Sequence, residues 1–377
     1  MPSRTFVSDA NIKKSLPPPK VIGPTTTKAT RPTNKIPQDI IDGAKVVKKE
    51  EFDPERHLQF QPPTYIYTMK EFGFEGQGIS PVAASEPFPL FTPEAIKQIR
   101  AEIFSEPVLR DCQYSSSFAK NMIRGMGRAR APFTHDAWSS PEVAAMVSSV
   151  AGIDLTHMFD YEIANINISI NDQTTVISSD GKVQSKDSTS AFAWHYDSFP
   201  FVCVTMVSDC SEMIGGETAI RTPSGEVRKI RGPAMVRDHS LHLAGPHVKP
   251  TLIHEQGTAV VMQGRYLEHK ALKSIGGRER ISMVTPFRPK SPLIRDESIL
   301  TGSRAISNWS ELYHGYTDYR LEVLEERLRE KRKSERIRED TKRPFDCESM
   351  RRFLEDQIAY LETTYSEIYP VEDMDED

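Results

Sequence analysis

Residues 194–207 read WHYDSFPFVCVTMV, and this stretch decides the fold that the sequence predicts. His195 and Asp197 stand just before a nearly apolar run at 199–207, which is typical of a buried strand. A second histidine, His269, follows after a gap of 71 residues and another apolar run at 257–262. Two imidazoles and one carboxylate can bind one face of a metal ion and leave its other positions open. The sequence therefore predicts a metal site with His195, Asp197 and His269 as its ligands.

An arginine follows the second histidine at a distance that suits an anchor for an acidic ligand. Residues 279–285 read ERISMVT, and strand side chains alternate, so Arg280 and Ser282 share one face. An arginine can hold a carboxylate through two parallel hydrogen bonds. Arg278 is the rival anchor on the same face, and Arg280 is preferred because of Ser282 and the spacing from His269. The alternative is that both histidines are ordinary partly buried residues and that Arg280 is a surface charge.

With these motifs the chain resembles the Fe(II)/2-oxoglutarate-dependent dioxygenase superfamily. The strand texts QGRYLEH at 263–269 and ERISMVTPFR at 279–288 also resemble a poorly characterised group from filamentous fungi. The resemblance covers roughly residues 85–290. It implies that His195, Asp197 and His269 bind Fe(II), that Arg280 and Ser282 bind the co-substrate 2-oxoglutarate, and that O2 takes the last metal position. Halogenating relatives lack the carboxylate ligand, so Asp197 disfavours halogenation.

The fold that the resemblance implies is α+β, with a double-stranded β-helix (jelly-roll or cupin-like) core at about 158–290. Helices N-terminal to the core and C-terminal support helices would flank it. We expect a dioxygenase domain at 85–290. Thr92-Pro93 and Ser140-Pro141 predict two helix starts, because each offers a hydroxyl N-cap and a proline in the first turn.

Residues 161–170, YEIANINISI, alternate apolar and polar side chains and so predict a strand. Asn165, Asn167 and Ser169 lie on its polar face. That face is either wetted by solvent or directed into the active site, where Asn165 or Asn167 would contact 2-oxoglutarate or substrate. The loops at 114–135 and 171–190 are further candidates for substrate contacts.

The activity implied by the resemblance is oxidation of a C–H bond, with release of succinate and CO2. His195, Asp197 and His269 would be the catalytic centre. The expected substrate is a small organic molecule, possibly of secondary metabolism. One alternative is a protein or nucleic-acid hydroxylase or demethylase with the same mechanism. The other is a β-helix protein that binds ligands without catalysis.

The composition of the chain indicates its cellular compartment and limits its possible binding partners. The net charge of −5 makes nucleic acid an unlikely partner for the whole molecule. Four scattered cysteines are typical of reduced thiols in an intracellular protein. The longest nearly apolar run is too short to span a bilayer, and the first residues lack the apolar segment of a secretory signal. We expect a cytoplasmic protein, with the nucleus as an alternative.

Both ends of the chain differ in composition from the middle. Residues 1–60 are basic and rich in proline, which predicts a disordered tail. Residues 291–370 are expected to form a helical extension that covers the core or mediates a homodimer, and 371–377 form an acidic tail. Residues 236–256 interrupt the pattern of the resembled family and are interpreted as a surface loop or as a retained intron. The histidines of that segment are not predicted to bind metal.

Overall fold

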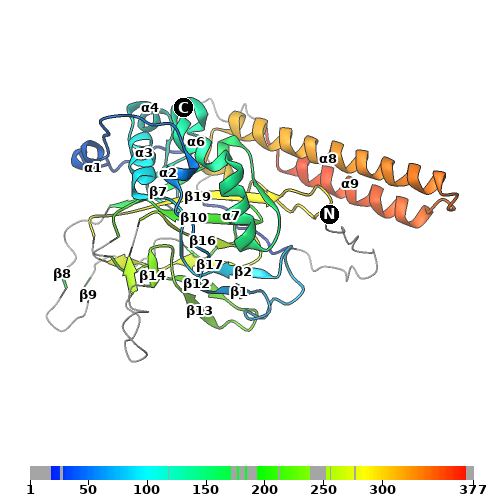
Figure 1. Ribbon diagram of the computed structural model, residues 1–377, viewed down its shortest axis with the longest axis horizontal. Coiled ribbons are helices and arrows are strands. Elements are labelled where there is room, and N and C mark those ends of the chain that lie inside the picture. Colours follow the sequence, from blue (N-terminus) through cyan, green and yellow to red (C-terminus); the bar gives the residue numbers. More distant parts are fainter. Residues whose placement is uncertain are drawn as a thin grey trace.

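The computed structural model places two antiparallel β-sheets face to face, with helices over the outer face of the larger sheet (Figure 1). A pair of long helices extends from one end of this body. The model describes residues 18–25, 29–117, 119–170, 176–177, 183–184, 193–210, 213–237, 252–254, 256–275 and 277–370.

The large sheet is built around two central strands, β10 (Phe201–Met206) and β19 (Glu279–Pro289). They pair antiparallel, with Phe201 opposite Phe287 and Met206 opposite Ser282. The strands follow the order β1-β2-β16-β10-β19-β7-β5-β4, while β3 pairs with β16 and β6 with β19. Their bounds are β1 Ile66–Thr68, β2 Val82–Ser85, β3 Phe88–Pro89, β4 Gln113–Tyr114, β5 Met122–Ile123, β6 Leu155–His157, β7 Asn165–Ile170 and β16 Thr258–Met262.

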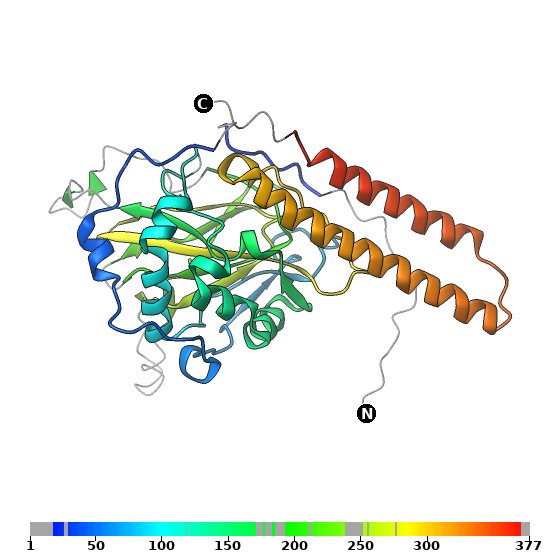
Figure 2. The same ribbon diagram turned by 90° about the horizontal axis from the view of Figure 1, so that it is seen from above.

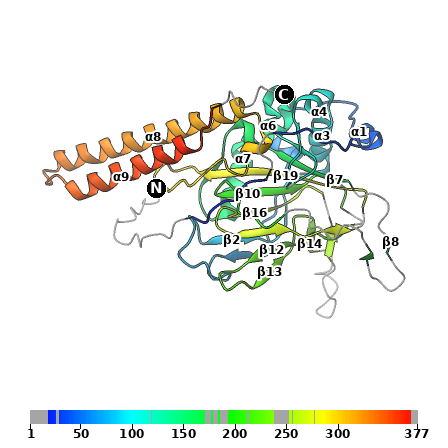
Figure 3. The same ribbon diagram turned by 180° about the vertical axis from the view of Figure 1, so that it is seen from behind.

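The second layer is a smaller sheet in the order β13-β12-β17. A turn at Gly215 and Gly216 leads into β12, and both glycines have positive φ (79° and 89°), which a side chain would strain. Three short strand pairs form separate two-stranded sheets, of which β14 lies near the smaller sheet and β8 at the edge of the molecule (Figure 3). The bounds are β12 Thr218–Arg221, β13 Val227–Ile230, β17 Glu268–Ala271, β11 Ile214–Gly215 paired with β18 Ser274–Ile275, β14 Met235–Arg237 paired with β15 Leu252–His254, and β8 Val176–Ile177 paired with β9 Val183–Gln184.

Three helices cover the outer face of the large sheet, namely α3 (Pro93–Ile103), α6 (Pro132–Ser139) and α7 (Pro141–Ala151). Both predicted helix starts are confirmed, because Thr92 accepts a hydrogen bond from the Ala95 amide and Ser140 accepts one from the Val143 amide. The shorter elements are α1 Gln38–Gly43, α2 Pro54–His57, α4 Glu106–Asp111, α5 Gly127–Arg130, and the 3-10 turns η1 Asp160–Glu162 and η3 Arg304–Ile306.

The alternation of strand residues separates the two faces of the large sheet. On β10, Phe201 and Cys203 join the core beneath the helices, whereas Val202 and Val204 face the smaller sheet. Trp138 of α6 is fully buried in the helix-side core, and its indole N–H points to the Met283 sulfur at 3.4 Å. This packing fixes the position of β19, which carries Arg280 and Ser282 on its opposite face.

The C-terminal extension is a helical hairpin of α8 (Trp309–Asp340) and α9 (Cys347–Ser366) that projects from the body of the protein (Figure 2). Arg320 of α8 joins the two helices, donating to the Thr364 hydroxyl at 2.9 Å and to the Tyr360 carbonyl at 2.7 Å. The first part of α8 packs on η1 and on residues beside it, such as Phe159 and Phe199, while the rest of the hairpin projects away from the body. For that projecting part the expectation of covering the core is not met, and the alternative of homodimer contact stays a prediction.

The exposed side of α9 carries several large apolar residues. Gln357, Tyr360 and Thr364 are the buried residues of α9. The predicted homodimer stays a prediction, and the surface it would use is the exposed stripe of Leu354, Ile358, Leu361 and Tyr365. None of the described helices combines the length and apolar character that crossing a bilayer requires.

The N-terminal prediction is corrected for residues 18–25 and 29–60, which the structure describes. Ile36 and Ile40 are buried in the helix-side core, and His57 is fully buried in α2. The few apolar residues of this segment stand among charged residues and prolines, so they form no helical or strand-like hydrophobic pattern in the sequence. In the structure, Ile36 and Ile40 nevertheless pack against the body of the protein. The sheet also begins earlier than residue 158, because the short strands β1–β6 join it.

The unusual segment 236–256 starts and ends in a paired structure. Strand β14 pairs antiparallel with β15, Met235 lying opposite His254. Residues 238–251 and 255 lie outside the described residues, as does most of 171–190. The choice between a surface loop and a retained intron therefore stays a prediction for transcript sequencing.

We expect Trp138→Ala to lower the free energy of unfolding by about 3–5 kcal/mol, because it opens a cavity under the central strands. Denaturant titration followed by circular dichroism measures the change. Tyr365→Ala, at a side chain that is 83% exposed, is the control and should change stability by less than about 0.5 kcal/mol. Equal losses from the two substitutions would contradict this account of the core.

Candidate metal and co-substrate site

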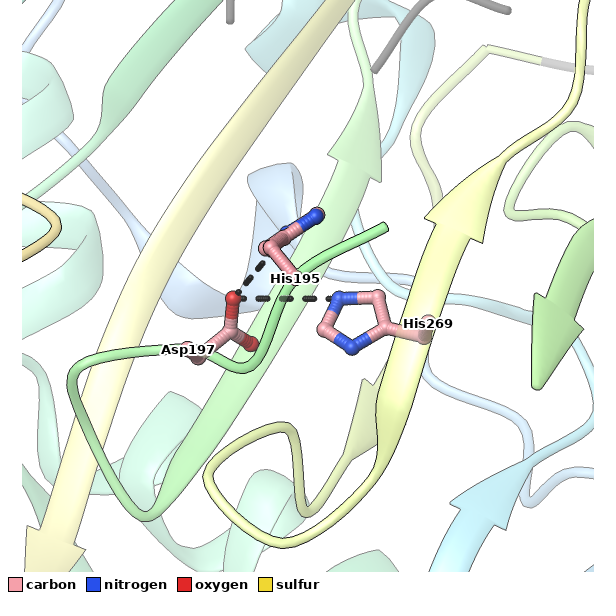
Figure 4. Close-up of side chains that lie close together, drawn as sticks. All are labelled: His195, Asp197 and His269. Carbon is pink, nitrogen blue, oxygen red and sulfur yellow. Dashed lines mark ion pairs between the residues drawn. The ribbon is translucent and has the colours of Figure 1, made fainter. Parts of the chain in front are cut away.

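The three predicted metal ligands meet between the two sheets (Figure 4). His195 and Asp197 lie in the segment that leads into β10, and His269 lies in β17 of the smaller sheet. The backbones of the two histidines pair directly, the His195 amide donating to the His269 carbonyl at 3.1 Å and the reverse bond measuring 2.9 Å. This bridge brings residues 74 positions apart into contact, so the gap in the sequence closes at the site.

The side chains are oriented for a shared ligand. The Nδ1 of His195 lies 2.9 Å from the Ala193 carbonyl, and the Nδ1 of His269 lies 2.9 Å from the Leu267 carbonyl. If each Nδ1 donates to its carbonyl, both Nε2 atoms are left as acceptors. These Nε2 atoms lie 3.5 and 3.7 Å from Oδ1 of Asp197. One ligand atom from each residue lies within 4.8 Å of the others, a cluster that one metal ion can bridge.

Gly264 makes room for the carboxylate. A Cβ at this position would lie 1.8 Å from Oδ2 of Asp197, and the Asp197 amide donates to the Gly264 carbonyl at 3.0 Å. Oδ2 is buried without a hydrogen-bond partner in the described part of the chain. A buried carboxylate oxygen left without a partner is costly, and a bound cation would satisfy it.

Burial and the charges within the cluster shift the pKa values of all three candidate ligands. Burial lowers the pKa of His269 to about 4, so this imidazole is neutral at pH 7. Burial alone would raise the pKa of Asp197, but His269 and His195 outweigh it and the pKa is lowered. For His195 burial is likewise outweighed, by the hydrogen bond to Asp197, and its pKa is raised.

The predicted co-substrate anchor is a buried and unpaired cation. Arg280 is 6% exposed, and no carboxylate of the described residues lies within ion-pairing distance of it. Burial lowers the pKa of its guanidinium below the usual range for arginine. Ser282, also buried, lies two residues along the same strand face, and both side chains line the cavity that holds the metal cluster. An uncompensated buried charge of this kind calls for an anionic ligand.

Two other arginines, the rival Arg278 and Arg265, serve other contacts. Arg278 lies outside the cavity, half exposed, and pairs with Asp39 of α1. Arg265 donates to the carbonyls of Glu297 at 3.2 Å and Pro19 at 2.5 Å, which makes it a structural tie for the N-terminal segment. The structure thus separates Arg280, which lines the cavity, from its rival Arg278.

The cavity encloses about 210 Å³ between the two sheets. Asn165 and Asn167 line it, so the polar face of β7 points inward instead of being wetted, while Ser169 on the same face is exposed. Most of the wall is apolar, which limits the entry of water. The apolar lining residues include Val202, Val204, Ile230, Val260, Met262, Val284 and Ile306.

Several residues that line the cavity were not identified from the sequence. Arg124, from the loop that was expected to contact substrate, and Glu162, from η1, line the cavity as an ion pair. Ile22 reaches the cavity from the N-terminal segment that was predicted to be disordered. Nothing in the local sequence marks these positions, because only the tertiary fold brings them to the site.

The donor set fits the metal and the anion that the sequence suggests. Two imidazoles and one carboxylate on one side of a metal suit a non-haem Fe(II), and the buried Oδ2 of Asp197 has no partner among the described residues. Arg280 and Ser282 offer donors for a carboxylate at the same cavity.

Solved structures of Fe(II)/2-oxoglutarate oxygenases are similar to this chain. The epimerase SnoN from nogalamycin biosynthesis, described as non-heme and alpha ketoglutarate dependent, is 14% identical, with 56% of this chain and 88% of that chain covered at a TM-score of 0.32. HygX from Streptomyces hygroscopicus, with nickel, 2-oxoglutarate and hygromycin B bound, is 14% identical, with 55% and 83% covered at a TM-score of 0.32.

An oxidoreductase of the 2OG-Fe(II) oxygenase family from Burkholderia pseudomallei is 13% identical, with 66% of this chain and 98% of that chain covered at a TM-score of 0.33. No family model and no curated protein matches the chain. Because the identities and TM-scores are low, the functional argument below rests on the site itself.

We predict that Gly264→Ala abolishes metal binding while the fold is retained, because its methyl group would collide with the carboxylate of Asp197. Calorimetric titration of the purified protein with a divalent metal under anaerobic conditions measures the loss. Gly43→Ala is the matched control, since nothing lies within 4 Å of a Cβ there. Wild-type metal affinity in Gly264→Ala would contradict the assigned geometry.

Proposed function

We propose that the protein is an Fe(II)/2-oxoglutarate-dependent dioxygenase that hydroxylates a C–H bond of a small organic molecule. The observation that carries the proposal is the buried, unpaired Arg280 in the cavity that also holds His195, Asp197 and His269. A structural metal site would need no such cation. A binding protein for a simple anion would need no facial set of metal ligands.

Each residue then has a definite task. His195, Asp197 and His269 hold Fe(II), their orientation fixed by the bonds from Nδ1 and by Gly264. Arg280 and Ser282 hold the distal carboxylate of 2-oxoglutarate. Iron with 2-oxoglutarate and O2 supplies the oxidising chemistry when bound, and succinate and CO2 are the products.

The rest of the chain contributes exclusion of water and positioning. The apolar walls of the cavity keep solvent from the centre, and the helices behind the large sheet fix the strands that carry Arg280 and Asn167. We propose further that the two sheets form a double-stranded β-helix, since the ligands sit between facing antiparallel layers.

Arg280 in β19 and Arg278 just before it provide a direct test of the proposed carboxylate anchor. We expect Arg280→Ala to weaken 2-oxoglutarate binding by at least about 30-fold, because a buried charge pair is lost. Arg278→Ala should change the affinity by less than about twofold, since Arg278 pairs with Asp39 at the surface. Calorimetric titration of 2-oxoglutarate into protein loaded with a redox-inert divalent metal gives both values. The opposite order of the two effects would place the anchor elsewhere.

The metal centre is tested by turnover. Asp197→Ala should reduce succinate formation from 2-oxoglutarate to background while circular dichroism shows an intact fold. Asp154→Ala, at an exposed position, is the control and should keep the wild-type rate. Succinate formation at the wild-type rate in Asp197→Ala would rule out the assigned triad. Its absence in the wild type would favour a non-catalytic binding protein.

A further inference from the structure

A second polar cluster lines the cavity, and neither the metal nor 2-oxoglutarate accounts for it. Arg124 and Glu162 are 5% and 1% exposed and form an ion pair of 2.6 Å. Arg124 also donates through Nε to the Ser307 hydroxyl at 3.3 Å. Asn165 completes the cluster, with its amide nitrogen 2.7 Å from Glu162 Oε2 and 3.1 Å from the Glu162 carbonyl.

The strand register places this cluster away from the co-substrate anchor. On the paired strands β7 and β19, Arg280 lies opposite Ser169, Ser282 opposite Asn167, and Val284 opposite Asn165. Asn165 is therefore four residues along the sheet from Arg280, which corresponds to about 13 Å. The cavity thus has two polar ends on one wall, one at Arg280 and one at Arg124 and Asn165, and Ser282 and Asn167 lie opposite each other between them.

The hydrogen bonds inside the cluster decide which atoms remain for a ligand. Both hydrogens of the Asn165 amide nitrogen are used by Glu162, so the amide oxygen is left over, buried and without a partner. Oδ1 of Asn167 is likewise buried and unpartnered. Nη1 of Arg124 has no hydrogen bond to any described residue. The cluster therefore offers two acceptors and at least one donor.

The charge balance restricts the ligand further. The guanidinium of Arg124 and the carboxylate of Glu162 cancel, so the cluster is neutral as a whole. A singly charged group placed beside a neutral, buried cluster loses its hydration without a compensating charge. A head that is neutral overall, yet both donates and accepts, loses less. The neighbouring apolar side chains, such as Val260, Val284 and Ile306, suit an aliphatic or aromatic body.

We propose, on the basis of the function proposed above, that Arg124, Glu162, Asn165 and Asn167 bind the polar head of the substrate. That head is neutral overall and carries N–H donors beside a carbonyl or carboxylate oxygen. Its N–H groups donate to the amide oxygens of Asn165 and Asn167, and its oxygen accepts from Arg124. The zwitterionic end of an α-amino acid and an uncharged carboxamide share this chemistry.

A series of probes with one body and different heads tests the proposal. L-leucine and 4-methylpentanamide are neutral overall, 4-methylpentanoate is an anion, and 3-methylbutylamine is a cation. Each is titrated into the full-length protein loaded with a redox-inert divalent metal and 2-oxoglutarate, and affinity is measured by calorimetry. We expect one or both neutral probes to bind at least about tenfold more tightly than either charged probe. The one that binds more tightly identifies the head.

Two variants connect the binding to the cluster. Asn165→Ala should weaken the preferred probe by about tenfold, because one hydrogen bond to a charged or strongly polar donor is lost. Asn121→Ala, at another buried asparagine that does not line the cavity, is the matched control and should bind as the wild type does. Both variants should bind 2-oxoglutarate with wild-type affinity.

The proposal is overturned if the charged probes bind as tightly as the neutral ones, if no probe binds at millimolar concentration, or if Asn165→Ala has no effect. These results would leave the proposed function intact, provided that the wild type binds 2-oxoglutarate and that Arg280→Ala weakens this binding. Loss of 2-oxoglutarate binding in the wild type would instead refute the proposed function itself.

Discussion

The direct backbone pairing of His195 with His269 is the constraint on which the site depends. Two reciprocal hydrogen bonds fix the smaller sheet against the segment that enters β10, and they set the two imidazoles side by side. Asp197 then reaches the same point only because residue 264 has no side chain. The ring orientations follow from bonds to nearby carbonyls, so the cluster is arranged by the backbone before any metal binds.

The cavity around this cluster combines a low-polarity wall with a few polar groups at separate places. Arg280 is left without an acidic partner in the described chain, whereas Arg124 is paired with Glu162. In the functions proposed above, this difference in pairing suits Arg280 to an anion and Arg124 to a head without net charge. The helices on the outer face of the sheet keep these ends at a fixed separation, since β19 and β7 are packed beneath them.

The sequence was sufficient to select His195, Asp197 and His269, which the structure brings together as a candidate metal cluster, and to predict a mixed fold rich in antiparallel strands. His195 and Asp197 are two positions apart, and the apolar runs beside this pair and before His269 mark buried strands, as β10 and β16 are. The pattern placed Arg278 and Arg280 on the same face, and it favoured Arg280 only through Ser282 and the spacing from His269. The structure separates them, since β19 begins at Glu279 and Arg278 turns outward to Asp39.

Other parts of the site were beyond local patterns. The alternation of apolar and polar residues on β7 identified its two faces. It could not show whether the polar face meets solvent or the cavity, because asparagine is compatible with both. The N-terminal segment was misjudged because Ile36 and Ile40 gain their stability from a distant core. Arg124 and Glu162 meet only through the tertiary fold, 38 residues apart along the chain.

The most direct test of the central claim is an anaerobic titration of the wild-type protein with Fe(II) and 2-oxoglutarate, followed by visible absorption. Chelation of iron by 2-oxoglutarate produces a metal-to-ligand charge-transfer band, and no knowledge of the substrate is needed. We expect a band that saturates at one equivalent of iron and is missing in His269→Ala. A folded wild-type protein that binds iron without developing the band would contradict the account.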